Sequence, residues 1–192
     1  MKKDLCHYIF ELGALKKFRH SGTLLAGVQQ PDSIAEHAYR TTIIGMILAE
    51  MEGANMQKVA MICLFHDNAE ARITDLHKVA RRYLDSEKAE LQAFTEQSER
   101  LPKSLGKKAL SWFQEYEGKK TTEAIIARDA DMLETAFQAK EYLDIGHTAC
   151  KDWIDNVKKC LKTTSARALI KEMEKTPFTE WWQGLKKIDI SY

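Results

Sequence analysis

Apolar residues in this chain recur three and four positions apart, which is the spacing of one face of an α-helix. The pattern starts in residues 2–17 and returns in segment after segment as far as residue 175. Only three prolines and nine glycines occur among the 192 residues, so few positions interrupt a helix. No stretch alternates apolar and polar residues as a half-buried strand would. The sequence therefore predicts an all-α fold, a bundle of about eight to ten helices.

Capping residues place several helix boundaries. Ser33 and Glu36 match the capping-box pattern, so a helix should begin there and run to about Glu52. Its apolar face should be buried, and consists of Ile44, Ile47, Leu48 and Met51. Later helices are expected at residues 56–72, 86–101, 102–118, 121–144, 148–161 and 164–175. We expect residues 1–192 to form a single domain, with a core at 5–145 and C-terminal helices at 148–187 that pack on the core or on a dimer partner.

The charge balance excludes some classes of partner. There are 29 basic and 28 acidic residues, and this net charge of +1 argues against nucleic acid. No stretch approaches the roughly 18 apolar residues of a membrane span, and Asp4, His7 and Glu11 interrupt what could resemble a signal peptide. The four cysteines are isolated and form no CxxC pair, which indicates reduced thiols and a cytoplasmic protein.

The chemistry of the chain is expected around residues 64–70, Leu-Phe-His-Asp-Asn-Ala-Glu. An apolar helical run leads directly into His66 and Asp67, so these polar groups lie near a core. Buried charge is costly unless it is paired or bound to a metal. On a helix, Glu70 would lie one turn beyond the pair, on the same side. A His-Asp pair alone is more often a hydrogen-bonded pair at a helix end than half of a metal site.

Two further positions could complete such a site. His37 lies in the first turn of a capped helix, and Asp131 interrupts an apolar helix face. Each alone has an ordinary interpretation, as a satisfied helix-start histidine or as an aspartate paired with Arg128. A set of two imidazoles and two carboxylates suits one divalent transition metal: Mn²⁺, Fe²⁺, Co²⁺, Ni²⁺ or Zn²⁺.

These residues together resemble the HD-domain metal-dependent phosphohydrolases, in particular the 5′-deoxynucleotidase (YfbR-like) branch. The resemblance rests on residues 29–40, QQPDSIAEHAYR, on residues 66–70, HDNAE, and on Asp75 beyond them. Two acids, Asp129 and Asp131, compete for the last metal position. The later stretch 138–142, QAKEY, resembles a family segment about ten residues beyond that position, and this register selects Asp131.

The resemblance implies a role for each matching residue. His37, His66, Asp67 and Asp131 would hold one divalent metal, and Glu70 would act on the water or the leaving group. Asp75 would contact the sugar 3′-hydroxyl, and Arg19 would bind the phosphate. The implied reaction is hydrolysis of (deoxy)nucleoside 5′-monophosphates to nucleoside and phosphate by a homodimer. Alternatives are an HD phosphohydrolase for a cyclic nucleotide, a triphosphate or an alarmone, and a nucleotide-binding module with little turnover.

The sequence departs from the family pattern around the sugar and the base. Thr74 stands where the family usually has glycine, and His77 where a proline is common. His20 follows Arg19, where some members have tryptophan. The metal ligands match the family pattern, so the sequence supports metal binding more strongly than it supports selectivity for deoxyribose over ribose.

Overall fold

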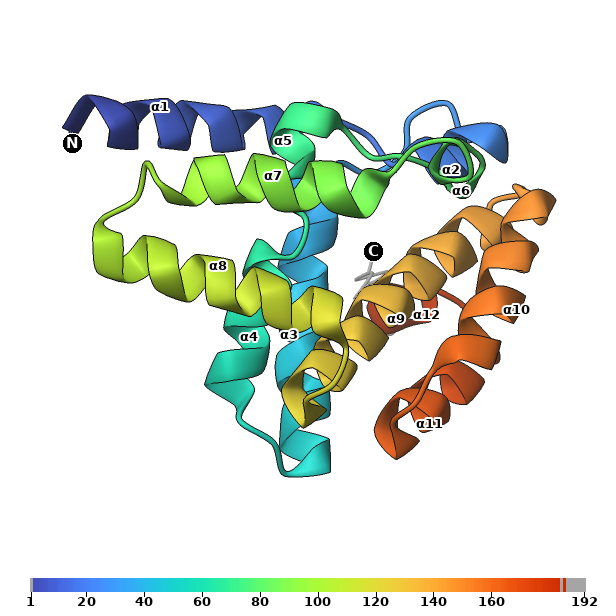
Figure 1. The fold of residues 1–192 in the computed structure, drawn as a ribbon. Coiled ribbons are helices and arrows are strands. Elements are labelled where there is room, and N and C mark those ends of the chain that lie inside the picture. The colour runs from blue at the N-terminus through green and yellow to red at the C-terminus, as the bar shows by residue number, and fades with distance from the viewer. Residues whose placement is uncertain (1, 184, 186–192) are drawn as a thin grey trace, which may run out of the picture.

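The described part of the chain is built from helices alone, which confirms the all-α prediction (Figure 1). The computed structural model describes residues 2–183 and 185. Within these residues, strand-like pairing is limited to one isolated bridge between Arg19 and Ser33. The α-helices are α1 (Lys2–Leu12), α2 (Ser21–Leu25), α3 (Ile34–Glu52), α4 (Met56–Phe65), α5 (Glu70–Ile73), α6 (Lys78–Arg81), α7 (Ser86–Ser98), α8 (Lys103–Gly118), α9 (Thr122–Asp144), α10 (Lys151–Cys160), α11 (Thr164–Met173) and α12 (Glu180–Gln183). Two 3-10 turns, η1 (Gly13–Lys16) and η2 (Thr148–Cys150), precede α2 and α10.

Side-chain caps fix the starts of the two longest helices. At α3, Ser33 accepts from the Glu36 backbone N–H, and the Glu36 side chain accepts from the Ser33 N–H, which is the expected capping box. At α9, the Thr121 hydroxyl accepts from the Ala124 N–H. These caps satisfy backbone donors that a helix start would otherwise leave unpaired, and the first of them sets the position of His37.

Three helices, α3, α4 and α9, form the centre of the molecule, and their buried residues belong to one apolar cluster (Figure 1). Gly45 allows α3 and α4 to approach closely. A Cβ atom at this position would lie 2.7 Å from Cys63 Sγ and 3.1 Å from Val59 Cγ1. This close contact brings His37, in the first turns of α3, near His66, the residue that follows α4. Helices α10 and α11 cover the other side of α9 and add Ile154, Val157 and Ile170 to the cluster.

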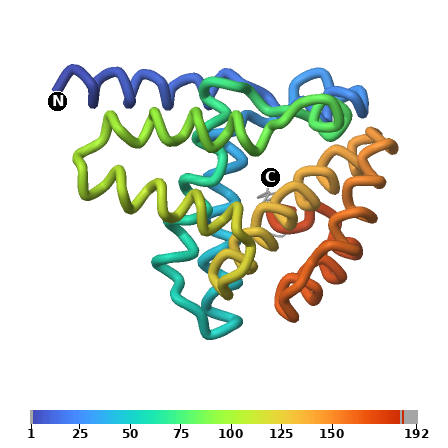
Figure 2. The backbone as a smooth tube through the Cα atoms, in the orientation of Figure 1, coloured from blue at the N-terminus to red at the C-terminus, as the bar shows by residue number. Residues whose placement is uncertain are grey.

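A second apolar cluster supports the segment that follows α4. Ala69 packs with residues of α7 and α8, among them Phe94 and Phe113, whose rings stack with centroids 4.6 Å apart. The tube in Figure 2 shows α1 and α7 running along the same side of the molecule, with α8 beside α7. The turn between α4 and α5 is therefore held between two packed layers.

The expected apolar face of α3 is only partly buried. Leu48 is fully buried and Ile44 packs against the core, but Ile47 and Met51 are 49% and 55% exposed. Ile47 and Met51 are exposed because α4 and α9 cover only one side of α3. On the other side, residues at every fourth position stay uncovered. Tyr39, Ile43, Ile47 and Met51 form this uncovered stripe.

The C-terminal segment reaches α12, where Trp181 and Leu185 are 75% and 71% exposed. Docking of these two side chains on the core, one of the two expected arrangements, is not observed. Residues 184, 186 and 187 of the expected helical segment lie outside the described residues. Among the described helices, none is both long enough and apolar enough to span a membrane.

Candidate metal and catalytic site

His66 and Asp67 lie on a turn between α4 and α5, whereas the sequence suggested a continuous helix. Helix α4 ends at Phe65, and the next residues form tight turns in which Asn68 N donates to Phe65 O and Glu70 N donates to Asp67 O. His66 Nδ1 lies 2.7 Å from Cys63 O, the carbonyl that the Asp67 N–H would reach in a continued helix. The side chain of His66 thus replaces a backbone donor, and the turn directs His66 and Asp67 together toward α3.

Four ligand atoms from three separate segments meet at this turn. His37 Nε2 lies 3.4 Å from His66 Nε2 and 3.5 Å from Asp67 Oδ2, and the last two atoms are 3.1 Å apart. Asp131 Oδ1, from α9, lies 3.4 Å from His37 Nε2 and 4.0 Å from His66 Nε2. Ligands about 2.1 Å from one ion, at tetrahedral or octahedral angles, would be separated by roughly 3.0–3.4 Å. The spacing of His37, His66 and Asp67 therefore fits one shared divalent cation.

The other ring nitrogens of both histidines have partners that leave Nε2 free for a ligand bond. His66 Nδ1–H donates to Cys63 O, and His37 Nδ1–H donates to Glu134 Oε2 in a short contact. A histidine whose second nitrogen donates to a carbonyl or carboxylate has the tautomer and ring orientation that metal coordination needs. The side chains of His37 and His66 are buried, with exposed fractions of 2% and 1%. The residues present thus fit a bound metal in chemistry as well as in spacing.

The electrostatics of the cluster also favour a cation. Burial alone would lower the pKa of His37 and of His66, yet the neighbouring carboxylates raise both pKa values above the ordinary range. For His37 the main carboxylates are Glu134, Asp131 and Asp67. For Asp131, burial opposes ionisation, but the hydrogen bond and charge of His37 and the charge of His66 lower its pKa. A site in which buried imidazoles prefer to be charged stabilises positive charge.

The two competing aspartates of α9 have different surroundings. Asp131 faces the histidines, and its Oδ2 accepts from Tyr116 Oη at 2.6 Å and from Arg128 Nη1 at 3.3 Å. Asp129 points to the opposite side of α9 and accepts from the backbone N–H groups of Lys162 and Thr163 just before α11. Asp129 is therefore used as a helix-start acceptor, and Asp131 is the acid directed to the cluster.

Glu70 begins α5 beside the cluster and is 5% exposed. Its Oε2 has no hydrogen-bond partner among the described residues, and the nearest cation is Arg81 Nη2, 3.9 Å from Oε1. Burial raises the pKa of Glu70 well above its usual value, and the charges of Asp67 and Asp75 raise it further. Glu70 is thus a carboxyl group that can hold a proton next to the cluster.

Asp75 lies at the rim of the same cleft and is joined to the segment before α3. Its Oδ2 accepts from the Ser21 backbone N–H at 2.6 Å and from the Ser21 hydroxyl at 3.0 Å. The preceding residue, Thr74, has φ of 61°, in the left-handed region that favours glycine. The family usually has glycine at this position, and a glycine would adopt this conformation without strain.

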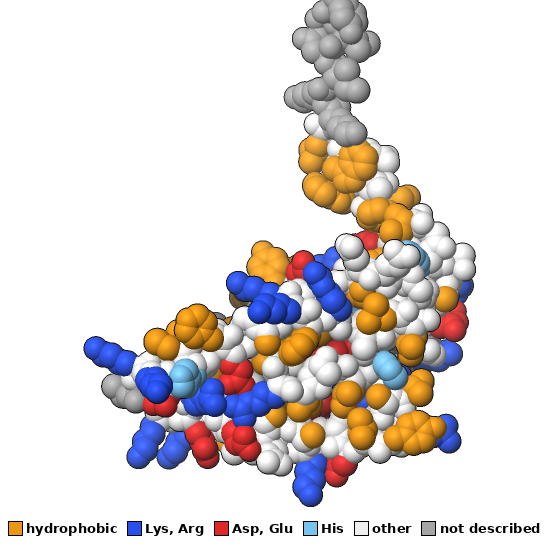
Figure 3. Space-filling model, turned by 90° about the horizontal axis from the view of Figure 1, so that it is seen from above, with side chains coloured by type: hydrophobic (Ala, Val, Ile, Leu, Met, Phe, Trp, Pro, Cys, Tyr) orange, Lys and Arg blue, Asp and Glu red, His pale blue; other side chains and the backbone are white. Residues whose placement is uncertain are grey.

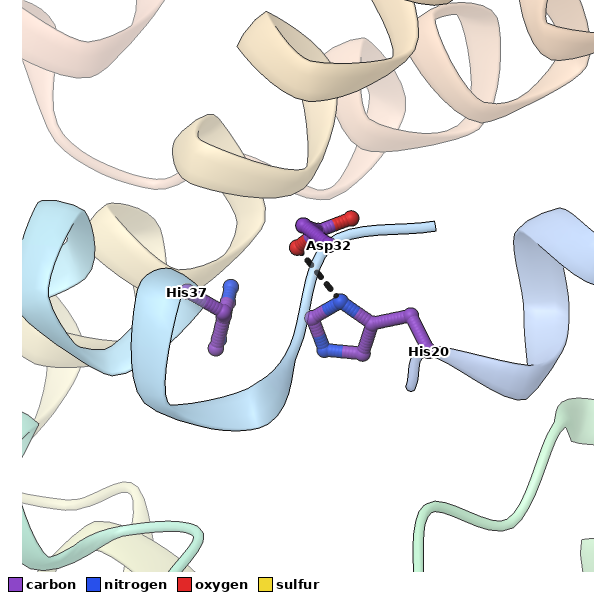
Figure 4. Close-up of side chains that lie close together, drawn as sticks. All are labelled: His20, Asp32 and His37. Carbon is purple, nitrogen blue, oxygen red and sulfur yellow. Dashed lines mark hydrogen bonds and ion pairs between the residues drawn. The ribbon is translucent and has the colours of Figure 1, made fainter. Parts of the chain in front are cut away.

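Arg19 does not reach the cluster. Its Nη1 donates to Pro31 O at 3.0 Å and to Glu36 Oε2 at 3.3 Å, and its side chain lines a second cavity, of about 450 Å³. The next residue, His20, points inward: its Nδ1 lies 2.8 Å from Asp32 Oδ2, and its ring meets that of His37 edge-on with centroids 4.7 Å apart (Figure 4). In this arrangement Arg19 contacts Pro31 and Glu36 and not the four ligand side chains, and its contact with phosphate stays a prediction.

A cleft of about 550 Å³ contains the cluster. Helix α9 contributes Asp131 and Thr135, and the segments around α2 and α6 contribute Asp75 and Lys78 to its lining. Helix α10 forms another part of the lining, with Trp153. A small organic phosphate could enter such a cleft, since its volume is within the ordinary range of ligand pockets.

Comparison with known proteins identifies the class defined by this fold and site. A model of the HD domain matches residues 12–174. The 5′-deoxynucleotidase HDDC2 of Homo sapiens is 25% identical over 175 residues, covering 90% of this chain and 85% of its own. The 5′-deoxynucleotidase HDDC2 of Dictyostelium discoideum is 32% identical over 140 residues, covering 68% and 73%. The chain belongs to the HD-domain family.

Solved structures agree with this assignment. A conserved hypothetical protein from Pyrococcus furiosus has a TM-score of 0.74 at 31% identity and covers 89% of this chain and 99% of its own. The family assignment confirms the resemblance on which the interpretation of residues 29–75 rested. It makes the protein an enzyme of the HD hydrolase superfamily, and the donor set suits a divalent metal.

Several residues around the site were not anticipated from the sequence. Glu134 holds His37 and also accepts from Arg40 Nε at 2.8 Å, and Tyr116 donates to Asp131. The available signal for Glu134 was its position three residues after Asp131, on the same side of one helix. Tyr116 carried no such signal, because α8 contacts Asp131 only through the packing of helices.

Proposed function

We propose that this protein is a metal-dependent phosphohydrolase that removes phosphate from deoxynucleoside 5′-monophosphates, giving a deoxynucleoside and phosphate. The observation that carries the proposal is the convergence of His37, His66, Asp67 and Asp131 beside a buried carboxyl group, Glu70, in one cleft. The names of the relatives supply the substrate class.

His37, His66, Asp67 and Asp131 would hold one divalent cation: Mn²⁺, Fe²⁺, Co²⁺, Ni²⁺ or Zn²⁺. When bound, such an ion polarises a phosphoryl oxygen and lowers the pKa of water. Glu134 and Cys63 O keep the two imidazoles in the required tautomer and orientation. Asp67 Oδ2 lies within 3.5 Å of both histidines, and the charge of Asp67 raises the pKa of Glu70, so Asp67 would belong to the ligand set and also act on Glu70.

Glu70 is proposed to handle the proton. In the hydrolysis, the bond between phosphorus and the sugar 5′-oxygen breaks and a bond from phosphorus to a water oxygen forms. The leaving oxygen takes up one proton and the attacking water loses one, which restores the protonated carboxyl group. Burial and the nearby acids keep Glu70 protonated to higher pH than an ordinary glutamate, which suits a proton donor to that oxygen. Its Oε2 has no partner among the described residues that would compete for the proton.

Arg128 is our candidate for the phosphate contact in place of Arg19. It lines the cleft, and its Nη1 donates to Tyr116 Oη and to Asp131 Oδ2, so the guanidinium lies beside the ligand set. Its Nε and Nη2 make no hydrogen bond within the described residues and remain available to phosphate oxygens, which a guanidinium matches well. Arg19 would act indirectly, by holding the loop at Pro31 next to Asp32. Asp75, at the rim, would contact the sugar 3′-hydroxyl.

We further propose that residues 1–192 form one domain that works as a cytoplasmic homodimer. The single cluster joining α3, α4, α9, α10 and α11 supports one domain, and the uncovered stripe on α3 supports a dimer. All four cysteines are free, which agrees with a reducing compartment. Basic and acidic side chains are interspersed on the face seen in Figure 3, which offers no argument for a nucleic-acid partner.

Phosphate release from a panel of deoxynucleoside and ribonucleoside 5′-monophosphates, with Mn²⁺ or Co²⁺ added, tests this proposal. We expect release from the deoxynucleotides and a loss of about 10²–10⁴-fold in kcat for Glu70→Gln, the range typical of a lost proton-transfer group. Bound metal, measured by elemental analysis, should stay the same in that variant. Full activity of Glu70→Gln would exclude the mechanism, and no release from any nucleotide by the wild-type protein would exclude the function.

A further inference from the structure

One part of the cleft lining, on α10, is not used by the ligands or by Glu70. Asp152, Trp153 and Asn156 lie on one face of α10 and line the cleft, together with Val157 and Cys160. The Trp153 side chain is partly buried and packs against the main apolar cluster, which fixes its position. A large aromatic ring held in this way at a ligand cleft presents a flat apolar surface with little loss of rotamer entropy on binding.

Two polar groups on this face make no hydrogen bond within the part of the chain that the structure describes. Trp153 Nε1–H and the Asn156 side-chain amide make no hydrogen bond among the described residues, although Asn156 is exposed toward the cleft. An amide offers a donor and an acceptor side by side, and an indole N–H adds one donor. Such a combination matches the edge of a nucleobase, which carries adjacent donors and acceptors on a flat ring.

The position of Asp75 gives the direction in which a nucleotide would extend. Asp75 Oδ2 is bonded to Ser21, and the next residue, Gly22, faces Trp153: a Cβ atom at Gly22 would lie 3.6 Å from Trp153 Cζ2 and Nε1. A sugar at Asp75 would therefore have the α10 face beside it. The phosphate would point the other way, toward Asp131 and Arg128, which are themselves in contact.

We propose that Trp153 and Asn156 form the nucleobase subsite of this enzyme, with the base packed against the Trp153 indole and its edge hydrogen-bonded by the Asn156 amide. The assignment rests on the proposed function, because it takes the ligand to be a nucleoside 5′-monophosphate. Gly22 lies directly beside the indole, because a Cβ atom there would make ordinary van der Waals contact with it, so the base would pack against the part of the Trp153 ring that lines the cleft.

Calorimetric titration can test the subsite without turnover. The parent protein is Glu70→Gln loaded with Mn²⁺, and the ligands are dAMP, dTMP and 2-deoxyribose 5-phosphate, which lacks a base. We expect the parent to bind the nucleotides about tenfold or more tightly than the base-free sugar phosphate, the usual gain from stacking a base on an aromatic ring. Adding Trp153→Ala should remove that advantage and leave binding of 2-deoxyribose 5-phosphate unchanged. Adding Asn156→Ala should change the ratio of the dAMP and dTMP affinities.

Two control variants separate base contact from a structural effect. Trp153→Phe keeps a flat ring and should retain most of the advantage, whereas Trp181→Ala removes an exposed tryptophan outside the cleft and should change nothing. Equal weakening of all three ligands by Trp153→Ala, or no effect on any of them, would overturn the subsite. Base-dependent binding lost in Trp153→Ala, in a wild-type protein that releases no phosphate, would support the subsite and reject only the proposed hydrolysis.

Discussion

His37 shows how a single side chain depends on a partner that is distant in sequence. Its Nδ1 is held by Glu134, 97 positions later, and Glu134 is held in turn by Arg40. The hydrogen bond from His37 Nδ1 to Glu134 fixes Nε2 as the nitrogen that faces the ligand set. Glu134 should therefore contribute to metal affinity as well as to the orientation of His37.

We predict that Glu134→Gln lowers the affinity for the divalent metal about 10–100-fold, the usual effect of losing the acceptor behind a ligating histidine. Glu141→Gln is the matched control, because Glu141 also accepts from Arg40 but is not bonded to His37. Competition with a chelator of known affinity measures the constant. The same affinity in both variants would show that the contact of Glu134 with His37 has no role in metal binding.

Glu90 is the buried acid in the cleft lining with the clearest pH signature. It is 8% exposed, and burial raises its pKa to about 7, although Arg81 Nη2 lies 3.0 Å from its Oε1. A carboxyl group with a raised pKa in the folded state favours folding in its protonated form. Its ionisation therefore costs stability as pH rises from the unfolded pKa near 4.5 through about 7.

We predict that Glu90→Gln is more stable than the wild type at pH 8, by on the order of 2–3 kcal/mol, and that the difference shrinks toward pH 5. The comparison is urea unfolding of both proteins at pH 5, 6, 7 and 8. A stability difference that does not change with pH would show that Glu90 ionises in the folded state like an ordinary glutamate.

At the scale of elements, the turn between α5 and α6 carries strain that the helices around it enforce. Thr74 occupies the left-handed region with a β-branched side chain, between Glu70 at the start of α5 and Asp75 at the cleft. Such a conformation costs on the order of 1–3 kcal/mol and persists where the surroundings impose it. Here the bonds from Ser21 to Asp75 hold the far side of the turn.

We predict that Thr74→Gly stabilises the fold by about 1 kcal/mol, because relief of strain exceeds the entropy that glycine gains in the unfolded chain. Thr74→Ala keeps a Cβ atom and should give no such gain. Equilibrium unfolding in urea compares the three proteins. A glycine variant less stable than the wild type would mean that the threonine side chain contributes contacts that outweigh its strain.

At the scale of the whole molecule, the uncovered stripe of α3 is the candidate surface for a contact between two copies of the chain. Tyr39, Ile43, Ile47 and Met51 follow one another at four-residue intervals, and each is at least 41% exposed. An exposed row of apolar side chains along one helix is typical of protein interfaces.

We predict that Ile43→Lys or Ile47→Lys converts the protein from a dimer to a monomer at micromolar concentration. Light scattering after size exclusion should change from twice the 22.0 kDa of one chain to that mass. Leu91→Lys is the control, because Leu91 on α7 is exposed to the same 41% as Ile43. A wild-type protein that is already monomeric would reject the dimer and leave the single-chain site intact.

The sequence by itself determined the all-α class, the starts of the capped helices and the identity of the clustered residues. Local chemistry was sufficient there, because the Ser33–Glu36 capping box and the Thr121 cap act over a few residues, and apolar residues at helical spacing mark a helix. The resemblance of residues 29–40 and 66–70 pointed to His37, His66, Asp67 and Asp131, and these side chains do converge.

Only the tertiary structure decided which side of each element meets the site. It placed Arg19 outside the cleft and His20 inside it, directed Asp129 to the backbone N–H groups just before α11, and brought Glu134, Tyr116 and Trp153 to the cleft lining. These outcomes depend on how α3, α4, α8, α9 and α10 pack. Packing is set by contacts between residues far apart in the sequence, such as Gly45 with Cys63, and no local pattern encodes them.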